Sequence, residues 1–330
     1  MNITRNRRFL LLAGKVVVVA LTLGLLYQAA FTAPDTFLTW RGIVRHAWGS
    51  PLRPLLLLTA ALIPLNWGFE ARKWQLLGQK IEQMTFLRAY RAVMVGLTLG
   101  FITPNRLGDY AGRVLELKSR ERLEAIGAIF MGRFCQLVAT VLVGSLGLGY
   151  FILRFYWELY PAACVSAILL LLALNVLVVL LLYNASAMVA LVAAIGPLRR
   201  FVPYLSIMSA YGTPELSRLL VLSLGRYTVF LLQFILLLVL FGVQLRPIEY
   251  VSGVSGTFFL KSVVPSVSLL SDLGVRELSA MYLFGLLGQA RLQVLSASLS
   301  LWLLNIAVPS AVGLLFVLRL RLAARKGVAA

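Results

Sequence analysis

The chain has 330 residues, of which 60% are hydrophobic and 13% are charged, and its mean hydropathy is +0.90. This composition excludes a soluble globular enzyme and a disordered chain, because no water-soluble fold buries so much apolar surface. The net charge of +19 suits nucleic-acid binding or the basic cytoplasmic rim of a membrane protein, and the hydropathy favours the membrane over nucleic acid.

Six apolar stretches are long enough to cross a bilayer, which requires about 20 residues in a helix. The first, Phe9–Phe31, follows three arginines but is too long for the apolar region of a signal peptide. We therefore predict that it is retained as a membrane span. The other five predicted spans are Leu52–Phe69, Ile126–Tyr150, Pro161–Tyr183, Leu219–Gly242 and Leu292–Leu318.

Two further apolar stretches, 92–103 and 251–264, are too short to cross the membrane. Each is interrupted by a proline, Pro104 or Pro265, and each then continues as a second helix-like arm that carries charges. Two short arms around a break predict a re-entrant helical hairpin in each case.

The distribution of basic residues sets the predicted orientation. With the N-terminus in the cytoplasm, the cytoplasmic segments hold about three times as many Lys and Arg residues as the outer segments. Residues 184–197 are then expected to lie along the cytoplasmic surface. We predict an all-α polytopic protein of the cytoplasmic (inner) membrane with both termini inside. Its six full spans and two re-entrant hairpins form a single domain, an inverted-topology repeat of residues 1–158 and 159–330.

Charged residues inside the predicted spans and hairpins are the candidate functional residues, because each costs roughly 2.5–3.5 kcal/mol at mid-membrane. The candidates for substrate binding are Arg106, Asp109, Arg113, Arg133, Arg226, Lys261, Asp272, Arg276 and Glu277. One interpretation is an internal brace, for instance Asp109 with Arg276 and Arg113 with Glu277. The other is an anion site for a lipid phosphate, since basic groups outnumber acidic ones and a helix begins after the Pro104 break. Gln136 and Gln233 either orient arginines or bond across helices, and Gly108, Gly112 and Gly274 permit close helix packing.

Metal, cofactor and catalytic sites have little support in the sequence. A single histidine, His46, and two cysteines, Cys135 and Cys164, cannot form a zinc site or a disulfide framework. No nucleophile motif is present. We therefore expect no cofactor and no enzymatic activity.

Three motifs resemble those of the transmembrane, flippase-like domain of lysyl-phosphatidylglycerol synthases. They are TPNRLGDYAGRVLEL at 103–117, VPSVSLLSDLGVRELSAMYLF at 264–284 and RKWQLLG at 72–78. The resemblance covers nearly the whole chain and implies an integral inner-membrane protein that translocates an aminoacylated phospholipid. The usual Glu of the first motif is Asp109 here. No aminoacyl-transferase domain follows the last span, so we expect a stand-alone member for which a lipid-modifying enzyme is a candidate partner.

The leading functional hypothesis is a flippase that moves a membrane phospholipid or lipid-linked anion, with the headgroup phosphate held by the arginines between the hairpins. Two alternatives are a non-transporting scaffold subunit and a membrane-embedded enzyme that acts on a lipid-linked substrate, with Asp109 or Glu277 as general base.

Overall fold

The computed structural model describes residues 36–103, 106–119, 122–264 and 269–328, and these residues form helices and connecting loops without a strand. Five helical stretches among them are long and apolar enough to cross a membrane: α3 (Pro54–Gly78), α6 (Ala125–Phe155), α7 (Pro161–Tyr183), α10 (Thr213–Leu240) and Arg291–Leu318. These match five of the six predicted spans. The remaining one, Phe9–Phe31, lies outside the described residues.

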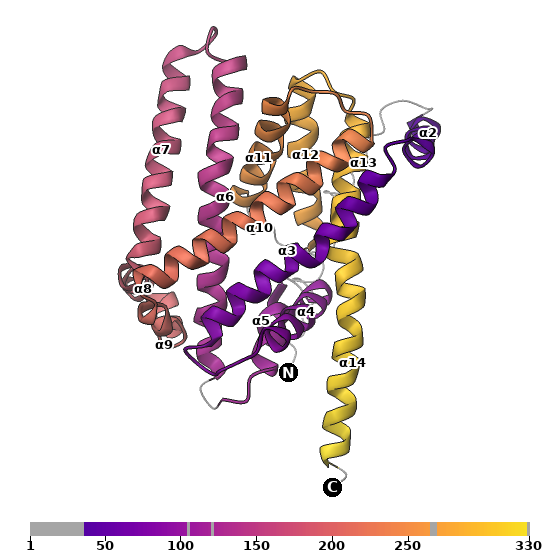
Figure 1. Cartoon of the computed structure of the whole chain (residues 1–330). Helices are drawn as coiled ribbons and strands as arrows, with labels where there is room; N and C mark the ends of the chain where they lie inside the picture. The colour runs from indigo at the N-terminus through magenta and orange to yellow at the C-terminus, as the bar shows by residue number, and fades with distance from the viewer. Residues whose placement is uncertain (1–35, 104–105, 120–121, 265–268, 329–330) are drawn as a thin grey trace, which may run out of the picture.

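The C-terminal span is composite. It begins as α13 (Arg291–Trp302), passes through a π-helical turn at Leu303–Ala307 and continues as α14 (Val308–Val328). Figure 1 shows α14 extending below the rest of the bundle. An amphipathic helix, α2 (Thr36–Gly49), precedes α3 at the opposite end of the molecule.

The two short apolar stretches each form a pair of helices around a break. The first pair is α4 (Phe86–Ile102) and α5 (Leu107–Leu115), and the second is α11 (Pro247–Val263) and α12 (Leu269–Leu286). Pro104 and Pro265 lie outside the described residues. In Figure 1, α4 and α5 are in the lower half of the bundle, and α11 and α12 are in the upper half. Re-entry from opposite faces and the inverted repeat stay predictions.

The arms of the first pair approach each other backbone to backbone. A Cβ added at Gly112 of α5 would come within 2.5 Å of the Gly96 Cα in α4, and one at Gly108 would overlap the Leu99 backbone. This confirms the prediction of close packing for Gly108 and Gly112. Arg106 precedes α5 with φ 54° and ψ 29°, a left-handed conformation that is uncommon outside glycine.

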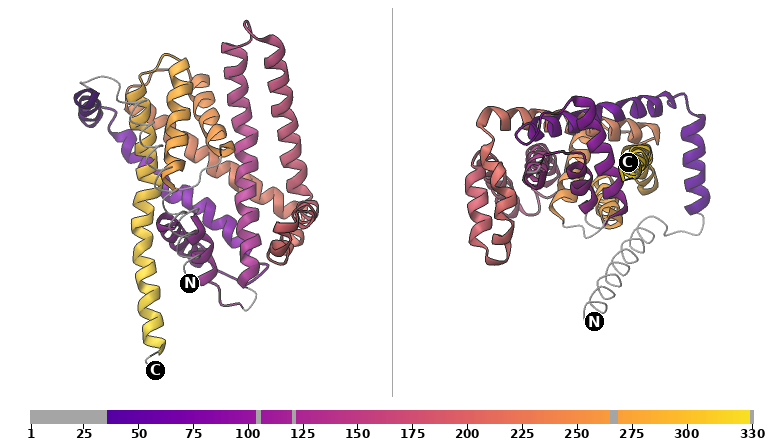
Figure 2. Two further views of the ribbon diagram at one scale, coloured as in Figure 1. Left: turned by 180° about the vertical axis from the view of Figure 1, so that it is seen from behind. Right: turned by 90° about the horizontal axis from the view of Figure 1, so that it is seen from below.

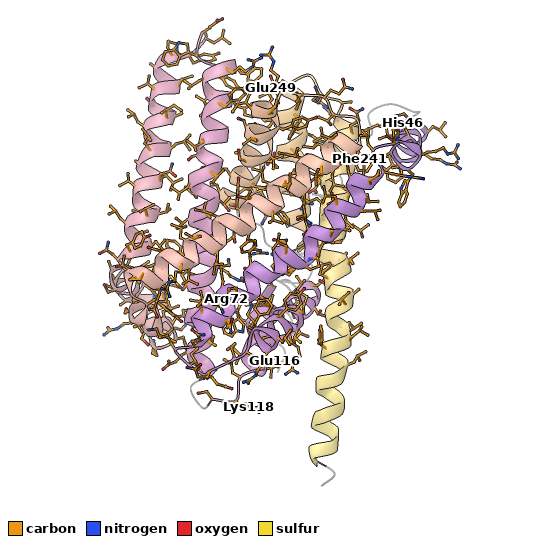
Figure 3. The ribbon with its side chains drawn as sticks, in the orientation of Figure 1. His46, Arg72, Glu116, Lys118, Phe241 and Glu249 are labelled. Carbon is orange, nitrogen blue, oxygen red and sulfur yellow. The ribbon has the colours of Figure 1, made fainter. Side chains whose placement is uncertain are left out.

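The long helices frame these pairs. α3 and α10 pack along each other and run diagonally across the bundle, while α6 and α7 stand side by side, joined by a short loop (Figure 1). α11 packs on α6, and α14 packs on α4. The views in Figure 2 show the same arrangement from behind and from below. In Figure 3, Glu116 and Lys118 lie at the lower end of the molecule and Glu249 lies at the upper end.

The surface of α7 is that of a lipid-facing helix. Its 18-residue apolar window has a mean hydropathy of 3.0, yet only 11% of that window is buried. Exposed leucines and valines cover it, including Leu169, Leu170 and Val176. A patch of this kind would aggregate in water but is stable against acyl chains. The chain is therefore a membrane protein.

Residues 184–212 form short helical segments after α7. They begin with α8 (Ala185–Ala194) and include α9 (Val202–Leu205), between 3₁₀ turns. In Figure 1, α8 and α9 lie beside the lower end of α7. The predicted position of residues 184–197 along the cytoplasmic membrane surface stays a prediction.

Candidate functional site

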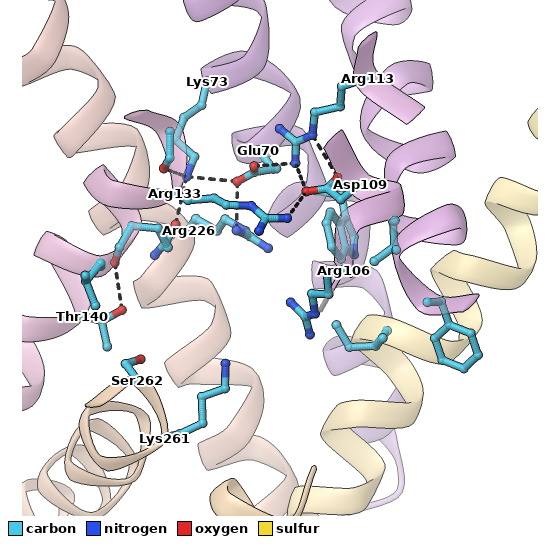
Figure 4. A pocket seen from close by; sticks show the side chains of 18 of the residues that line it. Glu70, Lys73, Arg106, Asp109, Arg113, Arg133, Thr140, Arg226, Lys261 and Ser262 are labelled. Atoms are coloured by element: carbon cyan, nitrogen blue, oxygen red, sulfur yellow. Dashed lines mark hydrogen bonds and ion pairs between the residues drawn. The ribbon is translucent and has the colours of Figure 1, made fainter. Parts of the chain in front are cut away.

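A polar cavity of about 390 Å³ lies inside the helical bundle. Helices α3, α4, α5, α6, α10 and α11 and the π-helical turn all contribute to its wall. Its charged lining residues are Glu70, Lys73, Arg106, Asp109, Arg113, Arg133, Arg226 and Lys261 (Figure 4). Among the lining residues that the structure describes, six side chains are basic and two are acidic, a formal excess of four positive charges.

The cavity lies well inside the helices. Glu70 is eight residues from the end of α3 and Arg133 is eight residues from the start of α6. At 1.5 Å per residue each is about 12 Å from that helix end. Arg226 is thirteen residues from the start of α10, or about 20 Å along the helix axis. These positions place charged groups well inside the long helices of a membrane protein, where charges are rare and usually functional.

Glu70 joins three cations from three helices. Its Oε2 lies 3.0 Å from the Lys73 Nζ and 2.9 Å from the Arg226 Nη1, and its Oε1 accepts from the Arg113 Nη2 at 2.9 Å. The residue is only 5% exposed. A buried carboxylate with this many charge-assisted bonds fixes α3, α5 and α10 relative to one another at the cavity wall.

Asp109 is the second carboxylate of the cavity. Its Oδ1 accepts from the Arg113 Nε at 3.0 Å, and its Oδ2 accepts from the Arg133 Nη2 at 2.6 Å and the Arg113 Nη2 at 3.3 Å. Arg113 thus bridges Asp109 and Glu70 with one planar guanidinium group. A lysine at this position has a single ammonium group and cannot reproduce that fork.

Aromatic rings cover the guanidinium groups. Arg226 lies over the Trp67 ring at 5.0 Å, Arg133 over the Tyr110 ring at 4.4 Å, and Arg113 over a Trp74 ring at 5.7 Å. Cation–π contacts of this kind stabilise arginines that have left water. The cations are therefore held in place by the protein and present an ordered array to the cavity.

The π-helical turn supports Arg226 from behind. The Arg226 Nε donates to Asn66 Oδ1 at 3.2 Å, and the Asn66 Nδ2 donates to Asn305 Oδ1 at 2.9 Å. The backbone carbonyl of Asn305 also accepts from the Trp67 Nε1 at 3.2 Å. Asn66 and Asn305 are both fully buried. This chain of bonds orients Arg226 and the ring over which it lies.

The two intramembrane glutamines bond across helices and not to arginines. Gln136 accepts from the Lys73 Nζ at 3.0 Å and donates to the Ser223 carbonyl at 3.2 Å. Gln233 donates to the Thr59 carbonyl at 2.9 Å. The bonds that these amides make in the structure go to a lysine and to backbone carbonyls. The alternative in which they orient arginines is therefore wrong.

The second helix pair contributes Lys261, whereas Arg276 and Glu277 lie elsewhere. Arg276 binds its neighbour Glu277, with the Arg276 Nε 3.1 Å from Glu277 Oε1, and it donates to Ser298 Oγ at 3.0 Å. Neither residue lines the cavity. The pairs Asp109–Arg276 and Arg113–Glu277, named as examples of a brace, are replaced by Asp109–Arg113 and Arg276–Glu277. The Asp272 side chain lies outside the described part of the structure.

Glu70 and Lys73 are not among the site residues predicted from the sequence. Lys73 follows the predicted span Leu52–Phe69, on the side predicted to be cytoplasmic. In the structure it is 1% exposed and lines the cavity. The available signal was the spacing of Glu70 and Lys73, which are three residues apart on one helical face and directly precede Trp74. α3 continues to Gly78, past the end of the apolar stretch, and so carries both residues into the bundle.

A second polar cluster lies in the loops at the lower end of the molecule. Glu82 binds Arg88 and accepts from the backbone N–H groups of Lys118 and Ser119 at 2.7 and 3.0 Å. Partial burial raises the pKa of the Glu82 carboxyl, but these hydrogen bonds outweigh it and hold the pKa below 4.5. Glu82 therefore ties the segment after α5 to the segment before α4.

No group of three or more His, Cys, Asp or Glu side chains within the described ranges could hold a metal ion. The cavity is rich in cationic side chains. Lys and Arg side chains from five elements converge on one volume, and carboxylates of the same chain occupy part of their bonding capacity.

Comparison with known protein families gives a match over most of the chain. The family described as "Lysylphosphatidylglycerol synthase TM region" matches residues 12–313 of the chain. No curated protein and no solved structure gave a significant match.

Proposed function

The chain belongs to the lysylphosphatidylglycerol synthase TM region family, and we propose that its cavity binds the phosphate of a membrane lipid and moves the headgroup across the cytoplasmic membrane. The family indicates a function that concerns membrane lipids. The observation that carries the finer proposal is the excess of four positive charges in a cavity built between membrane helices. Phosphate is the anion that membrane lipids make most available, and arginine forks suit its geometry.

The proposed mechanism is competition between the phosphate and the carboxylates. Arg113 joins Asp109 of α5 to Glu70 of α3 in the structure. A phosphate that takes over the Arg113 fork would release Glu70 and so loosen the first helix pair from α3. Movement of the helix pairs relative to the long helices would then expose the headgroup to the other side.

A scaffold role is the second candidate, because both oxygens of Glu70 and both of Asp109 are engaged by basic groups. The described lining of the cavity, however, has six basic groups for two acidic ones. The surplus favours a ligand with negative charge.

The test is lipid movement in vesicles. The full chain is reconstituted into liposomes that contain phosphatidylglycerol with a fluorescent label on an acyl chain, and label in the outer leaflet is bleached with dithionite. Arg226→Gln is the main variant, because Glu70 retains Lys73 and Arg113 and the fold should persist. Arg45→Gln in α2, an exposed position outside the cavity, is the matched control.

We expect the wild type and Arg45→Gln to move the labelled lipid and Arg226→Gln to move it at least about tenfold more slowly, since loss of one charge-assisted bond weakens binding by roughly that factor. Equal rates in all three proteins, with Arg226→Gln folded, would show that the cavity does not handle the lipid. The scaffold role would then be preferred.

A further inference from the structure

We propose that the cavity selects lipid headgroups by negative charge and prefers a phosphomonoester or diphosphate to a phosphodiester, while it excludes an aminoacylated headgroup of net positive charge. This inference rests on the proposed function and specifies its substrate class. It departs from the substrate that the family description suggests.

The first step concerns the acidic groups. An aminoacylated headgroup carries ammonium groups, and an ammonium inside a membrane needs a carboxylate partner. Among the described lining residues, the carboxylates are Glu70 and Asp109. All four of their oxygens already accept from Lys73, Arg113, Arg133 or Arg226. An incoming ammonium would have to displace one of these cations and would leave it buried.

The second step concerns the basic groups. Figure 4 shows Arg106 and Lys261 below the ion pairs of Glu70 and Asp109, so cations border the cavity on more than one side. They come from α3, α5 with its N-terminal cap, α6, α10 and α11. A singly charged phosphodiester leaves a surplus of three positive charges in the lining. A group with two or more negative charges compensates the surplus better.

The third step concerns the backbone at Arg106. Its left-handed φ of 54° is the only positive φ of a non-glycine residue in the described part of the chain. Such a conformation is energetically unfavourable for a non-glycine residue and clusters at ligand sites. It places this arginine at the cavity at the start of α5, where the positive end of the helix dipole also favours anions.

The experiment is competition binding of three lipids with identical acyl chains to the full-length protein in detergent, measured by native mass spectrometry at pH 7. Phosphatidic acid carries a phosphomonoester of charge near −1.5 to −2. Phosphatidylglycerol carries −1, and lysyl-phosphatidylglycerol carries +1. We expect affinity to fall in that order, by up to roughly tenfold from phosphatidic acid to phosphatidylglycerol and by roughly a hundredfold from phosphatidylglycerol to lysyl-phosphatidylglycerol. One unit charge about 10 Å away produces a factor of about ten at an effective dielectric constant near 20, and the second step changes the charge by two units.

Lys261→Gln and Lys261→Arg test the electrostatic origin of the order. Lys261→Gln leaves the ion pairs of Glu70 and Asp109 in place, and we expect it to reduce the preference for phosphatidic acid over phosphatidylglycerol severalfold. Lys261→Arg keeps the charge and should retain the preference. Arg45→Gln is the control outside the cavity.

The outcomes separate the two proposals. If lysyl-phosphatidylglycerol binds as well as phosphatidylglycerol or better, and Lys261→Gln or Arg226→Gln alters that binding, the charge selection is overturned and the proposed function stands. Equal binding of phosphatidic acid and phosphatidylglycerol also overturns it. If neither variant alters the binding of any of the three lipids, the proposed function itself fails.

Discussion

Replacement of Glu70 by Gln tests whether the ion pairs around this residue hold the cavity together. The side chain pairs with Lys73, Arg113 and Arg226 at 2.9–3.0 Å, and Lys73 is 1% exposed. Loss of the carboxylate leaves the Lys73 ammonium buried without an ionised partner in this set. Breaking a buried pair in this way costs about 3–5 kcal/mol in soluble proteins. At roughly 2–4 °C per kcal/mol, the melting temperature should fall by about 6–20 °C.

The measurement is thermal unfolding of the purified protein in detergent, and Glu215→Gln is the matched control. Glu215 also pairs with a lysine, Lys80, at 2.9 Å, but the two side chains are 41% and 37% exposed. An exposed pair contributes only about 0–1 kcal/mol. The double variant Glu70→Gln with Lys73→Met should regain much of the lost stability, because the orphaned charge is removed as well. Equal shifts for Glu70→Gln and Glu215→Gln, or no recovery in the double variant, would refute this account of the cavity.

Three further outcomes are expected. Gly112→Ala places a Cβ about 2.5 Å from the Gly96 Cα and should lower the free energy of unfolding by about 1–3 kcal/mol. The control Gly285→Ala, with nothing within 4 Å, should leave the stability of the protein unchanged. Equal melting temperatures of the two variants would contradict the close helix packing. Arg113→Lys keeps the charge but loses the guanidinium fork that joins two carboxylates. Lipid movement should therefore fall severalfold or more in the dithionite assay, although the protein stays folded. Wild-type rates in this variant would place the arginine outside the mechanism. The lowered pKa of Glu82 means that its contribution to stability is present above the unfolded-state pKa of about 4.3 and is lost as the pH falls through the folded-state pKa. The protection of the loop amides before α4 and after α5 against hydrogen exchange, measured relative to the intrinsic rate at each pH, should fall on acidification in the wild type and should be low at every pH in Glu82→Gln.

The sequence predicted the basic residues of the cavity better than the acidic ones. A charge inside an apolar stretch or a hairpin is costly and usually functional. This criterion identifies five basic residues of the cavity, Arg106, Arg113, Arg133, Arg226 and Lys261. The structure places all five at one cavity. Their role in substrate binding stays a prediction.

The sequence prediction missed Glu70 and Lys73, because hydropathy marks where an apolar stretch ends but not where the helix ends. α3 runs nine residues beyond Phe69, and its contacts with α10 and α6 bury residues that a hydropathy profile assigns to a loop. The ion pairs show a related limit. The bond of Asp109 to Arg113 follows from helical spacing, whereas that of Asp109 to Arg133 depends on how α5 and α6 pack.

The positions of the cations bear on the mechanism through the predicted repeat. Lys73, Arg106, Arg113 and Arg133 belong to residues 1–158, while Arg226 and Lys261 belong to residues 159–330. The cavity is therefore assembled from both predicted halves, as are the binding sites of transporters with inverted repeats. Glu70 accepts bonds from both groups, since Lys73 and Arg226 share one of its oxygens. Any displacement of one half against the other must stretch the Glu70–Arg226 bond unless a bound anion replaces it. A phosphate that bridges cations of both halves would thus stabilise the rearranged state. The stabilisation equals the difference between the binding free energies of the phosphate in the two states.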